Sequence, residues 1–251
     1  MKIPSSIKAL ILDLDGVLWK DQESIGNLPA IFKKIEEHGL KVTLATNNST
    51  QPKEERLSKL ESFGVNIEKV GALTSSIATA ALLIDKFPEG GELYVVGMEG
   101  ILDELKLVGF RTFTESNIPE KPLAVVVGMD WGLNYEKIAN ASMLIQGGAP
   151  FYATNPDKTF PTPAGLMPGA GTLLAAVETA SGVSPIVAGK PNAYLFELAM
   201  KKMGTSPDET LMVGDRLETD ILGGQNAGCK TALVLSGVTE RARAEAWLPK
   251  V

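Results

Sequence analysis

The sequence predicts an α/β protein with a three-layer, Rossmann-like core built on a parallel sheet, and an inserted α/β cap domain. Short apolar runs alternate with stretches of helical periodicity near both ends of the chain, a pattern typical of βα units. These runs are apolar throughout, like strands that helices cover on both faces. The middle of the chain repeats the βα pattern with other sequence features, including two similar pieces and a loop rich in proline and glycine. We therefore assign residues 1–76 and 188–251 to the core and residues 77–187 to the cap.

The N-terminal part predicts strands and helices in alternation. The expected elements are a strand over residues 8–13, a helix over 28–39, a strand over 41–48 and a helix over 52–64. Pro29 near the start of the first helix and Gly39 at its end occupy the positions that these residues favour. Leu57, Leu60 and Phe63 recur at helical spacing in the second helix. This βαβα order favours a parallel sheet with helices on both faces.

The middle of the chain contains two similar pieces, YVVGMEG (residues 94–100) and AVVVGMDWG (residues 124–132). Each reads as a strand that ends in Gly-Met-acid and leads into a helix, a weak sign of an internal βα repetition. A third strand is expected over residues 150–157, followed by a loop rich in proline and glycine over residues 158–171. We interpret this segment as a second α/β unit inserted into the first.

The C-terminal part returns to the pattern of the core. The expected elements are a strand over residues 184–190, a helix over 192–204, a strand over 210–215, a short helix over 219–229 and a last strand over 230–238. The long helix places Phe196, Ala199, Met200 and Met203 on one side, which is most simply its core-facing side. Both ends of the chain therefore contribute to one core.

Composition excludes several classes of protein. The 251 residues carry a formal net charge of −6 and no basic cluster, so nucleic acid is not an expected partner. No apolar run approaches the ~20 residues that span a bilayer, and no signal-like segment follows the first residues. We expect a cytoplasmic protein that does not bind membranes.

The scarce residues narrow the chemistry. A single cysteine, Cys229, excludes an intrachain disulfide and a cysteine metal cluster. The single histidine, His38, lies at a predicted helix end, where a charge–dipole interaction explains it. Any mechanism that needs histidine would have to use His38. Catalysis is therefore expected to depend on carboxylates, lysines, hydroxyls and a hard metal ion.

Four predicted strands end in polar, chemically capable side chains. Ligands of open parallel α/β sheets bind outside the carboxyl ends of the strands, so we expect these side chains to converge at one edge of one sheet. They are Asp13 and Asp15 after the first strand, Thr46, Asn47 and Asn48 after the second, Lys190 after the third, and Asp215 and Asp220 after the fourth.

The residue types point to phosphoryl transfer. Several carboxylates without histidine or cysteine suit a hard divalent cation held by oxygen, and Mg²⁺ is the expected one. Lys190 supplies a positive charge for a phosphoryl oxygen, and Thr46 offers a hydroxyl next to amides that open a helix. The two aspartates can divide the work: one carboxylate attacks phosphorus, and the other moves the proton of the leaving oxygen.

The four motifs DLDGVL, TNN, GKP and GDRLETDI, in this order and spacing, resemble those of the haloacid dehalogenase superfamily of phosphatases. The inserted segment resembles the large α/β cap of its 4-nitrophenylphosphatase and nucleotide-phosphatase subfamily. The resemblance covers nearly the whole chain. It implies hydrolysis of small phosphate esters, such as 4-nitrophenyl phosphate, sugar phosphates or nucleoside monophosphates, with Mg²⁺ and a phosphoaspartate.

The resemblance also implies a role for each motif residue. Asp13 would be the nucleophile and a metal ligand, and Asp15 the general acid/base, with its backbone carbonyl on the metal. Lys190 would neutralise the phosphate. The remaining implied residues are the phosphate contacts Thr46, Asn47 and Asn48, and the metal-site residues Asp215 and Asp220. A second aspartate at position 15 separates phosphate-ester hydrolysis from dehalogenation, in which the leaving halide needs no proton.

The cap offers further candidates. Asn155 and Asp157 could contact the substrate, or Asp157 could bond its own backbone in an Asn-Pro-Asp turn. Trp131 and Tyr135 could stack on an aromatic leaving group, but we expect them to pack in the cap or at a dimer face. A homodimer is therefore one possible state of the protein, because these aromatic residues could pack at its interface.

Other functions of the same core stay open as alternatives. A phosphomutase would use the same pair of aspartates and would differ in a cap that retains the phosphorylated intermediate. A phosphonate hydrolase would need a cap lysine in an apolar setting, which the sequence does not offer. A catalytically silent binding protein would have no need for both Asp13 and Asp15.

Overall fold

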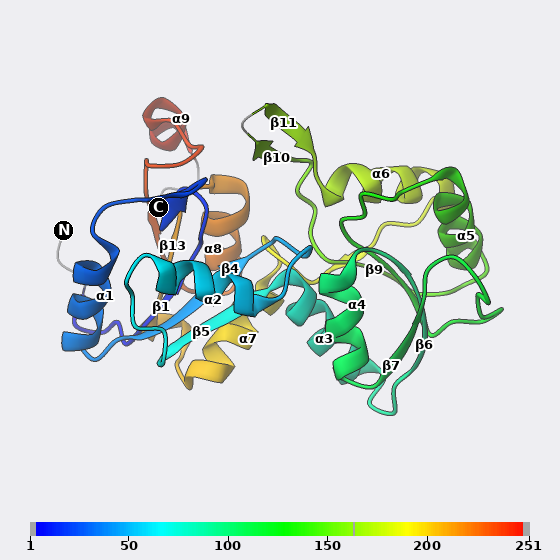
Figure 1. Cartoon of the computed structure of the whole chain (residues 1–251), viewed down its shortest axis with the longest axis horizontal. Coiled ribbons are helices and arrows are strands. Elements are labelled where there is room, and N and C mark those ends of the chain that lie inside the picture. The colour runs from blue at the N-terminus through cyan, green and yellow to red at the C-terminus, as the bar shows by residue number, and fades with distance from the viewer. Residues whose placement is uncertain (1–3, 163, 248–251) are drawn as a thin grey trace. The chain divides into compact units, whose positions relative to one another are not determined.

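The structure is a computed structural model that describes residues 4–162 and 164–247 (Figure 1). The chain divides into two compact units. The core unit comprises Met1–Thr46, Lys53–Leu73 and Lys190–Val251, and the inserted unit comprises Asn47–Pro52 and Thr74–Gly189. No helix within the described ranges combines the length and the apolar character that a membrane span requires.

The core unit is built on a five-stranded sheet in the order β14-β13-β1-β4-β5 (Figure 1). The pairs β1–β4, β1–β13 and β13–β14 are parallel, and Ala9 lies opposite both Lys41 and Thr210. The strands are β1 (Ala9–Leu12), β4 (Lys41–Thr46), β5 (Val70–Thr74), β13 (Thr210–Gly214) and β14 (Lys230–Leu233). Their carboxyl ends therefore share one edge where the pairing is parallel.

Alternation along the strands sends side chains to two helical layers. Leu10, Leu12 and Leu44 join one apolar cluster with helices α1 (Leu28–Glu37) and α2 (Lys53–Ser62). Met212 faces the other way, where α8 (Leu222–Asn226) approaches so closely that a Cβ on Gly224 would lie 3.0 Å from it. Helix α7 (Ala193–Met203) packs on this second layer, since Phe196 touches Gly223 of α8. The result is the expected three-layer core.

Helix α1 ends as its sequence predicts. Asn27 caps its start by accepting a hydrogen bond from the Ala30 amide at 3.1 Å, and His38 is the residue that caps its end. The exposed His38 ring lies 2.8 Å from the Lys34 carbonyl oxygen through Nδ1. The histidine thus has the structural position predicted for it.

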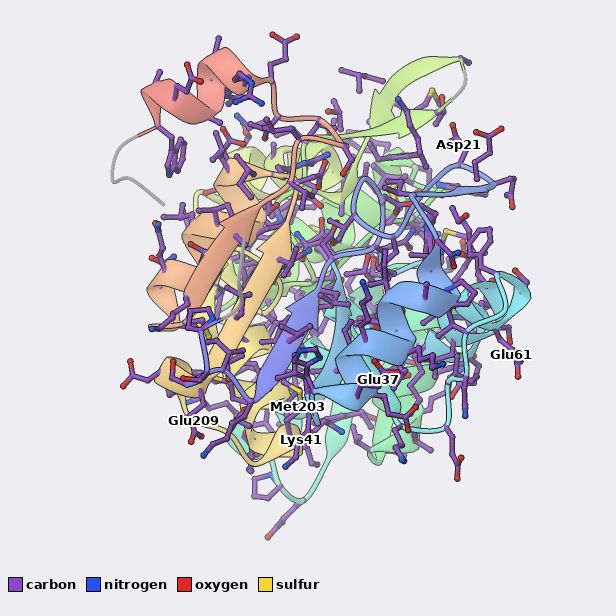
Figure 2. All side chains as sticks on the ribbon, turned by 90° about the vertical axis from the view of Figure 1, so that its left-hand side faces the viewer. Asp21, Glu37, Lys41, Glu61, Met203 and Glu209 are labelled. Carbon is purple, nitrogen blue, oxygen red and sulfur yellow. The ribbon has the colours of Figure 1, made fainter. Side chains whose placement is uncertain are left out.

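The two ends of the core sheet carry different features: polar contacts of lysine side chains at one end and a two-stranded ribbon at the other (Figure 2). Where the strands begin, Lys41 donates to the Met203 carbonyl at 2.5 Å, and Lys8 pairs with Glu209. At the carboxyl end, a two-stranded ribbon bearing Asp21 follows β1. The remaining core elements are the ribbon strands β2 (Trp19–Lys20) and β3 (Glu23–Ser24), the turns η1 (Pro207–Glu209) and η2 (Leu217–Ile221), and α9 (Arg241–Ala246).

The inserted unit has its own sheet, in the order β12-β9-β8-β6-β7, covered by helices on both faces. Leu93 and Val95 pack toward helices α3 and α4, whereas Tyr94 and Val96 pack toward α5 and α6. The elements are α3 (Ser75–Lys86), β6 (Gly91–Val96), α4 (Glu99–Leu107), β7 (Phe110–Phe113), β8 (Ala124–Val127), α5 (Tyr135–Gln146), β9 (Phe151–Ala153), α6 (Ala170–Ser181) and β12 (Ile186–Val187).

Several expected elements are corrected by the structure. The predicted strand over residues 184–190 shortens to β12, which pairs with β9 of the inserted unit and does not belong to the core sheet. The predicted loop over residues 158–171 contains a hairpin, β10 (Thr159–Thr162) with β11 (Gly165–Pro168). Apolar character indicates that a strand is buried but not which sheet it joins, and that explains the first error.

Candidate active site

Asp13 opens the site at the carboxyl end of β1. Its backbone amide still donates to the Val213 carbonyl at 3.0 Å, so the residue extends the ladder between β1 and β13 by one step. This pairing fixes the position from which its side chain projects, and that side chain is only 13% exposed. The carboxylate is therefore held at the sheet edge by a rigid backbone.

Lys190 joins this carboxylate to a second one. Its ammonium donates to Asp13 Oδ1 at 2.5 Å, to Asp220 Oδ1 at 2.6 Å and to the Ala45 carbonyl at 3.1 Å. The three contacts match the three N–H donors of a lysine side chain. The Lys190 and Asp220 side chains are 3% and 1% exposed, so water screens this network poorly.

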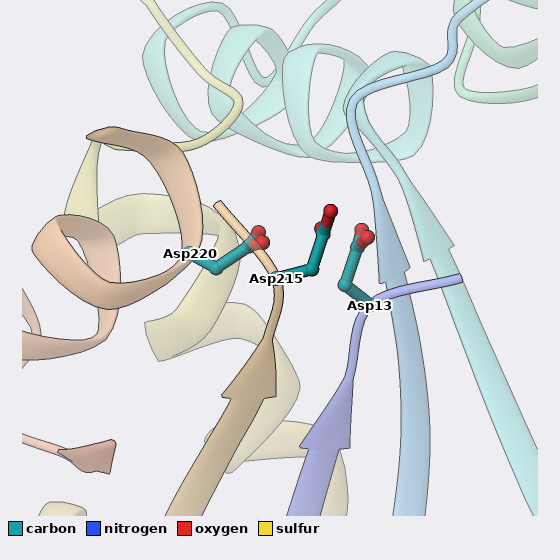
Figure 3. A group of neighbouring side chains, drawn as sticks. All are labelled: Asp13, Asp215 and Asp220. Atoms are coloured by element: carbon teal, nitrogen blue, oxygen red, sulfur yellow. The ribbon is translucent and has the colours of Figure 1, made fainter. Parts of the chain in front are cut away.

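Three carboxylates converge here, as Figure 3 shows. One carboxylate oxygen from each of Asp13, Asp215 and Asp220 lies within 4.8 Å of the others. Asp215 follows β13, and its Oδ2 accepts a hydrogen bond from the Val238 amide at 2.7 Å. Asp220 lies in the π-helical turn η2, where its Oδ2 accepts from the Arg216 amide at 3.1 Å.

Glycines allow the backbone to close around Asp215. A Cβ on Gly237 would lie 1.8 Å from Asp215 Oδ2, and one on Gly16 would lie 2.6 Å from the same oxygen. Gly16 also has a φ of +86°, which favours glycine and lets the chain turn sharply after Asp15. A glycine at position 16 thus meets both requirements, the positive φ and the close approach to Asp215.

The electrostatics of the cluster indicate an excess of negative charge. Burial raises the pKa of Asp13 to about 8, since the attraction of Lys190 is outweighed by desolvation together with repulsion from Asp220 and Asp215. The pKa of Asp215 is also raised by burial, although the Val238 amide opposes the shift. For Lys190, the two neighbouring carboxylates outweigh burial and hold the pKa above its usual range.

This donor set fits a hard divalent cation. It offers carboxylate oxygens from three residues within a small volume, and hard cations such as Mg²⁺ prefer such oxygen ligands. One ammonium does not balance three carboxylates, so the residues would gain from a further positive charge. Both the chemistry of the donor atoms and their proximity to one another therefore fit a bound divalent cation.

Asp15 lies outside this cluster of carboxylates. It is exposed, and its Oδ1 accepts a hydrogen bond from the Trp19 indole N–H at 2.9 Å. Trp19 is 1% exposed, and the Lys59 ammonium lies 4.6 Å from its ring centroid. The two aspartates therefore have different environments: Asp13 is part of a buried charge network, and Asp15 is a solvent-accessible carboxylate oriented by an indole.

The second motif spans the boundary of the two units. Thr46 ends β4 and is buried in the core unit, whereas Asn47 and Asn48 follow in the inserted unit. Asn48 Oδ1 accepts from the amide and the hydroxyl of Thr50, at 3.0 and 2.7 Å, and so shapes the loop. The Asn47 carbonyl accepts from the Ser75 hydroxyl at 2.7 Å.

The structure connects Asn155 and Asp157 to this second motif. Asn155 is buried, and its amide group donates to the Asn47 carbonyl at 2.7 Å. The Asn47 amide group donates to Asp157 Oδ1 at 3.2 Å. Within the turn, Asn155 Oδ1 accepts a hydrogen bond from the Asp157 amide at 3.2 Å.

A hollow of about 300 Å³ lies within the inserted unit. Its buried cation, Lys137, is neutralised by Asp130 at 2.9 Å and by Glu115 at 3.3 Å, so this hollow offers no unbalanced positive charge for a phosphate. Trp131, 71% exposed, lines it, and Tyr135 is 85% exposed. These two aromatic residues therefore do not pack in the interior of the cap, and the other part of the expectation, packing at a dimer face, stays a prediction.

Arg56 of α2 was not among the predicted site residues. Two of its guanidinium nitrogens, Nε and Nη2, are buried and have no hydrogen-bond partner. The sequence spacing could have indicated its burial. Arg56 precedes Leu60 by four residues, which places it on the face of the helix that carries this fully buried leucine.

With this geometry, the core unit is an α/β scaffold that holds a carboxylate–lysine network at the carboxyl edge of its sheet. A family model described as haloacid dehalogenase-like hydrolase matches residues 10–111, and a second HAD-hydrolase-like model matches residues 187–250. The chain belongs to the haloacid dehalogenase-like hydrolases.

Individual relatives agree with this membership. The chain is 37% identical to the ribonucleotide monophosphatase NagD of Escherichia coli, over 93% of this chain and 90% of that protein. It is also 37% identical to phosphoglycolate phosphatase 2 of Arabidopsis thaliana, over 93% of this chain and 84% of that protein. The structure of a 4-nitrophenylphosphatase from Thermotoga maritima superposes with a TM-score of 0.89 at 31% identity, covering 98% of this chain and 92% of that one.

These matches bear on three predictions. The predicted family and the α/β fold class are confirmed. The predicted enzyme class, a phosphoric monoester hydrolase, is confirmed as well.

Proposed function

We propose that this chain is a Mg²⁺-dependent phosphomonoesterase that hydrolyses small phosphate esters through a phosphoaspartate on Asp13. The observation that carries the proposal is the network in which Lys190 bridges Asp13 and Asp220 beside Asp215. A nucleophile for phosphorus needs a nearby positive charge, because the phosphate itself is negative. The network supplies that charge at the carboxyl edge of the sheet, where ligands bind in this class of fold.

Each aspartate of the first motif has one chemical task in this proposal. An Asp13 carboxylate oxygen attacks phosphorus, and the bond from phosphorus to the ester oxygen breaks. Asp15 gives its proton to that leaving oxygen. Asp15 then takes a proton from a water molecule, which attacks phosphorus, releases inorganic phosphate and regenerates the Asp13 carboxylate. The exposure of Asp15 and its bond to Trp19 suit a group that must exchange protons with the substrate and with water.

The metal site belongs to the same proposal. Asp13, Asp215 and Asp220, with the backbone carbonyl of Asp15, would hold Mg²⁺, which supplies positive charge that offsets the phosphate and the nucleophile. Thr46, Asn47 and Asn48 would hold the phosphate. The hydrogen bonds from Asn155 and to Asp157 support a positioning role for these two residues, through Asn47.

The names of the relatives support a substrate class. Their names specify ribonucleotide monophosphates, phosphoglycolate and 4-nitrophenyl phosphate, which are all small monoesters. We assign the same class to this chain, with the core unit as the catalytic domain and the inserted unit as a cap.

Removal of divalent metal should abolish hydrolysis of 4-nitrophenyl phosphate, because the buried carboxylates would then repel the substrate. EDTA in excess is expected to reduce release of nitrophenol to background, and Mg²⁺ added above the chelator should restore it. EDTA already saturated with Mg²⁺ is the control. Equal release of nitrophenol and inorganic phosphate would identify hydrolysis and reject a mutase. Full activity in EDTA would contradict the proposal.

Asp15→Asn should separate substrates by their leaving groups. Nitrophenolate leaves without a proton, whereas an alkoxide needs one, so the loss should be about tenfold to a hundredfold greater for an alkyl phosphate. The measurement compares kcat/KM for 4-nitrophenyl phosphate and for a simple alkyl phosphate in both proteins. Equal losses with both substrates would reject the acid role of Asp15.

A further inference from the structure

Arg56 stands beside the proposed catalytic machinery with unused hydrogen-bonding capacity. It lies on α2 of the core unit, on the helical face that also buries Leu60. Its Nε and Nη2 atoms are buried without an acceptor. A guanidinium that is taken out of water and left unpaired opposes folding, so its presence calls for a partner.

The contacts of α2 place Arg56 on the side of Asp15. Lys59, three residues further along this helix, lies over the ring of Trp19, whose indole N–H donates to Asp15 at 2.9 Å. Asp15 is the carboxylate that most strongly opposes the lowering of the Arg56 pKa by burial, and Glu55 follows. No hydrogen bond joins Arg56 to either of them among the described residues. Asp15 attracts Arg56 but leaves its donors available.

Neighbouring Lys59 differs in this respect. It also lies on α2, but its ammonium donates to the Asp21 carbonyl at 2.6 Å and contacts the Trp19 ring. Lys59 therefore has a structural role, since it ties the β2–β3 ribbon to the helix. Arg56 and Lys59 both lie near Asp15, and of these two cations only Arg56 has buried nitrogens, Nε and Nη2, without an acceptor.

We propose that Arg56 is a specificity-determining residue that binds an anionic group, a carboxylate or a second phosphate, on the leaving group of the substrate. The proposal rests on the proposed function, in which Asp15 protonates the leaving oxygen, so groups near Asp15 belong to the leaving group. The planar fork of a guanidinium matches both kinds of anion. The preferred substrates are then monoesters whose alcohol part is itself negatively charged.

The test compares two pairs of substrates that differ by one anionic group. The first pair is 2-phosphoglycolate and 2-hydroxyethyl phosphate, and the second is 1,3-propanediol bisphosphate and 3-hydroxypropyl phosphate. The ratio of kcat/KM within each pair is measured with Mg²⁺ for the wild type, Arg56→Gln, Arg56→Lys and the control Lys33→Gln. Lys33 is an exposed cation on α1.

The wild type should prefer the anionic member of at least one pair. Arg56→Gln should lower that ratio about tenfold or more, Arg56→Lys should retain part of it, and Lys33→Gln should leave it unchanged. The pair that responds identifies the anion. The melting temperature of Arg56→Gln should not fall, because an unpaired buried charge is removed, whereas a structural role would lower it.

Three results would overturn the proposal. The first is a wild-type protein that shows no preference for the anionic substrate in either pair, a result that needs no variant. An unchanged ratio in a folded Arg56→Gln protein would show that Arg56 does not contact the leaving group. Hydrolysis of 4-nitrophenyl phosphate by the wild type is measured in parallel. Its absence would reject the proposed function itself, and this inference with it, whereas its presence confines a failure to Arg56.

Discussion

Asp13→Asn should remove turnover of 4-nitrophenyl phosphate, by about three orders of magnitude or more. An amide oxygen is too weak a nucleophile to form the bond to phosphorus, and the substitution also removes one carboxylate from the cluster of three. The measurement is kcat/KM with saturating Mg²⁺. A variant with wild-type turnover would show that Asp13 is not the nucleophile.

The fold should survive this substitution. Burial already disfavours the charged form of Asp13, whose pKa is raised to about 8, so a neutral isostere does not cost the native state a favourable charge. Lys190 keeps Asp220 and the Ala45 carbonyl as partners. An unchanged circular dichroism spectrum would attribute the loss of activity to chemistry. Asp208→Asn, at an exposed aspartate of the same unit, is the matched control and should retain full activity.

A second comparison separates the nucleophile from the metal ligands. Asp215→Asn also removes a carboxylate of the cluster but leaves Asp13 in place, so raised Mg²⁺ should restore part of its activity. Asp13→Asn should not respond to Mg²⁺. Equal recovery of both variants would mean that Asp13 acts only as a ligand.

The fold could be predicted because its determinants are local. The continuous apolar run that contains Leu10 and Leu12, and the helical spacing of Leu57 and Leu60, are visible in the sequence, and these side chains pack in one core cluster in the structure. The carboxyl ends of β1, β4 and β13 do meet at one edge, as the order of the elements suggests.

The approach of Lys190 to the site could not be predicted in the same way. Lys190 was predicted to follow the third strand of the core sheet, but the strand before it, β12, pairs with β9 in the inserted unit. Two residue pairs, Ile186 with Tyr152 and Val187 with Ala153, determine which sheet β12 joins. No apolar pattern in the sequence distinguishes one parallel partner strand from another. The side chain nevertheless reaches Asp13 and Asp220.

Side-chain partners were the least predictable feature. Asn155 lies far from Asn47 in the chain, and their hydrogen bond depends on how two loops of the inserted unit fold together. Arg56 was overlooked because a charged residue on a helix with charged neighbours is usually solvated. Only the three-dimensional structure reveals that part of its guanidinium is buried.

Lys190→Met should affect both activity and stability. The substitution removes the positive charge that faces the phosphate, and it leaves the buried Asp13 and Asp220 carboxylates without their shared donor. Breaking a buried ion pair by removing one partner typically lowers the free energy of unfolding by about 3 kcal/mol. Urea unfolding in EDTA measures this loss without a contribution from metal binding, and turnover should be lost in parallel.

The double variant Lys190→Met/Asp220→Asn tests the physical cause of that loss. If the cost arises from uncompensated buried charge, then neutralising Asp220, which is 1% exposed, should recover a large part of the stability that Lys190→Met loses. Asp220→Asn alone should cost less than Lys190→Met, because Lys190 would still bond Asp13. A double variant as unstable as the sum of the two single variants would mean that the residues do not interact. The loss of stability in Lys190→Met would then not arise from the unpaired charge of Asp220, and the electrostatic explanation of the network would be wrong.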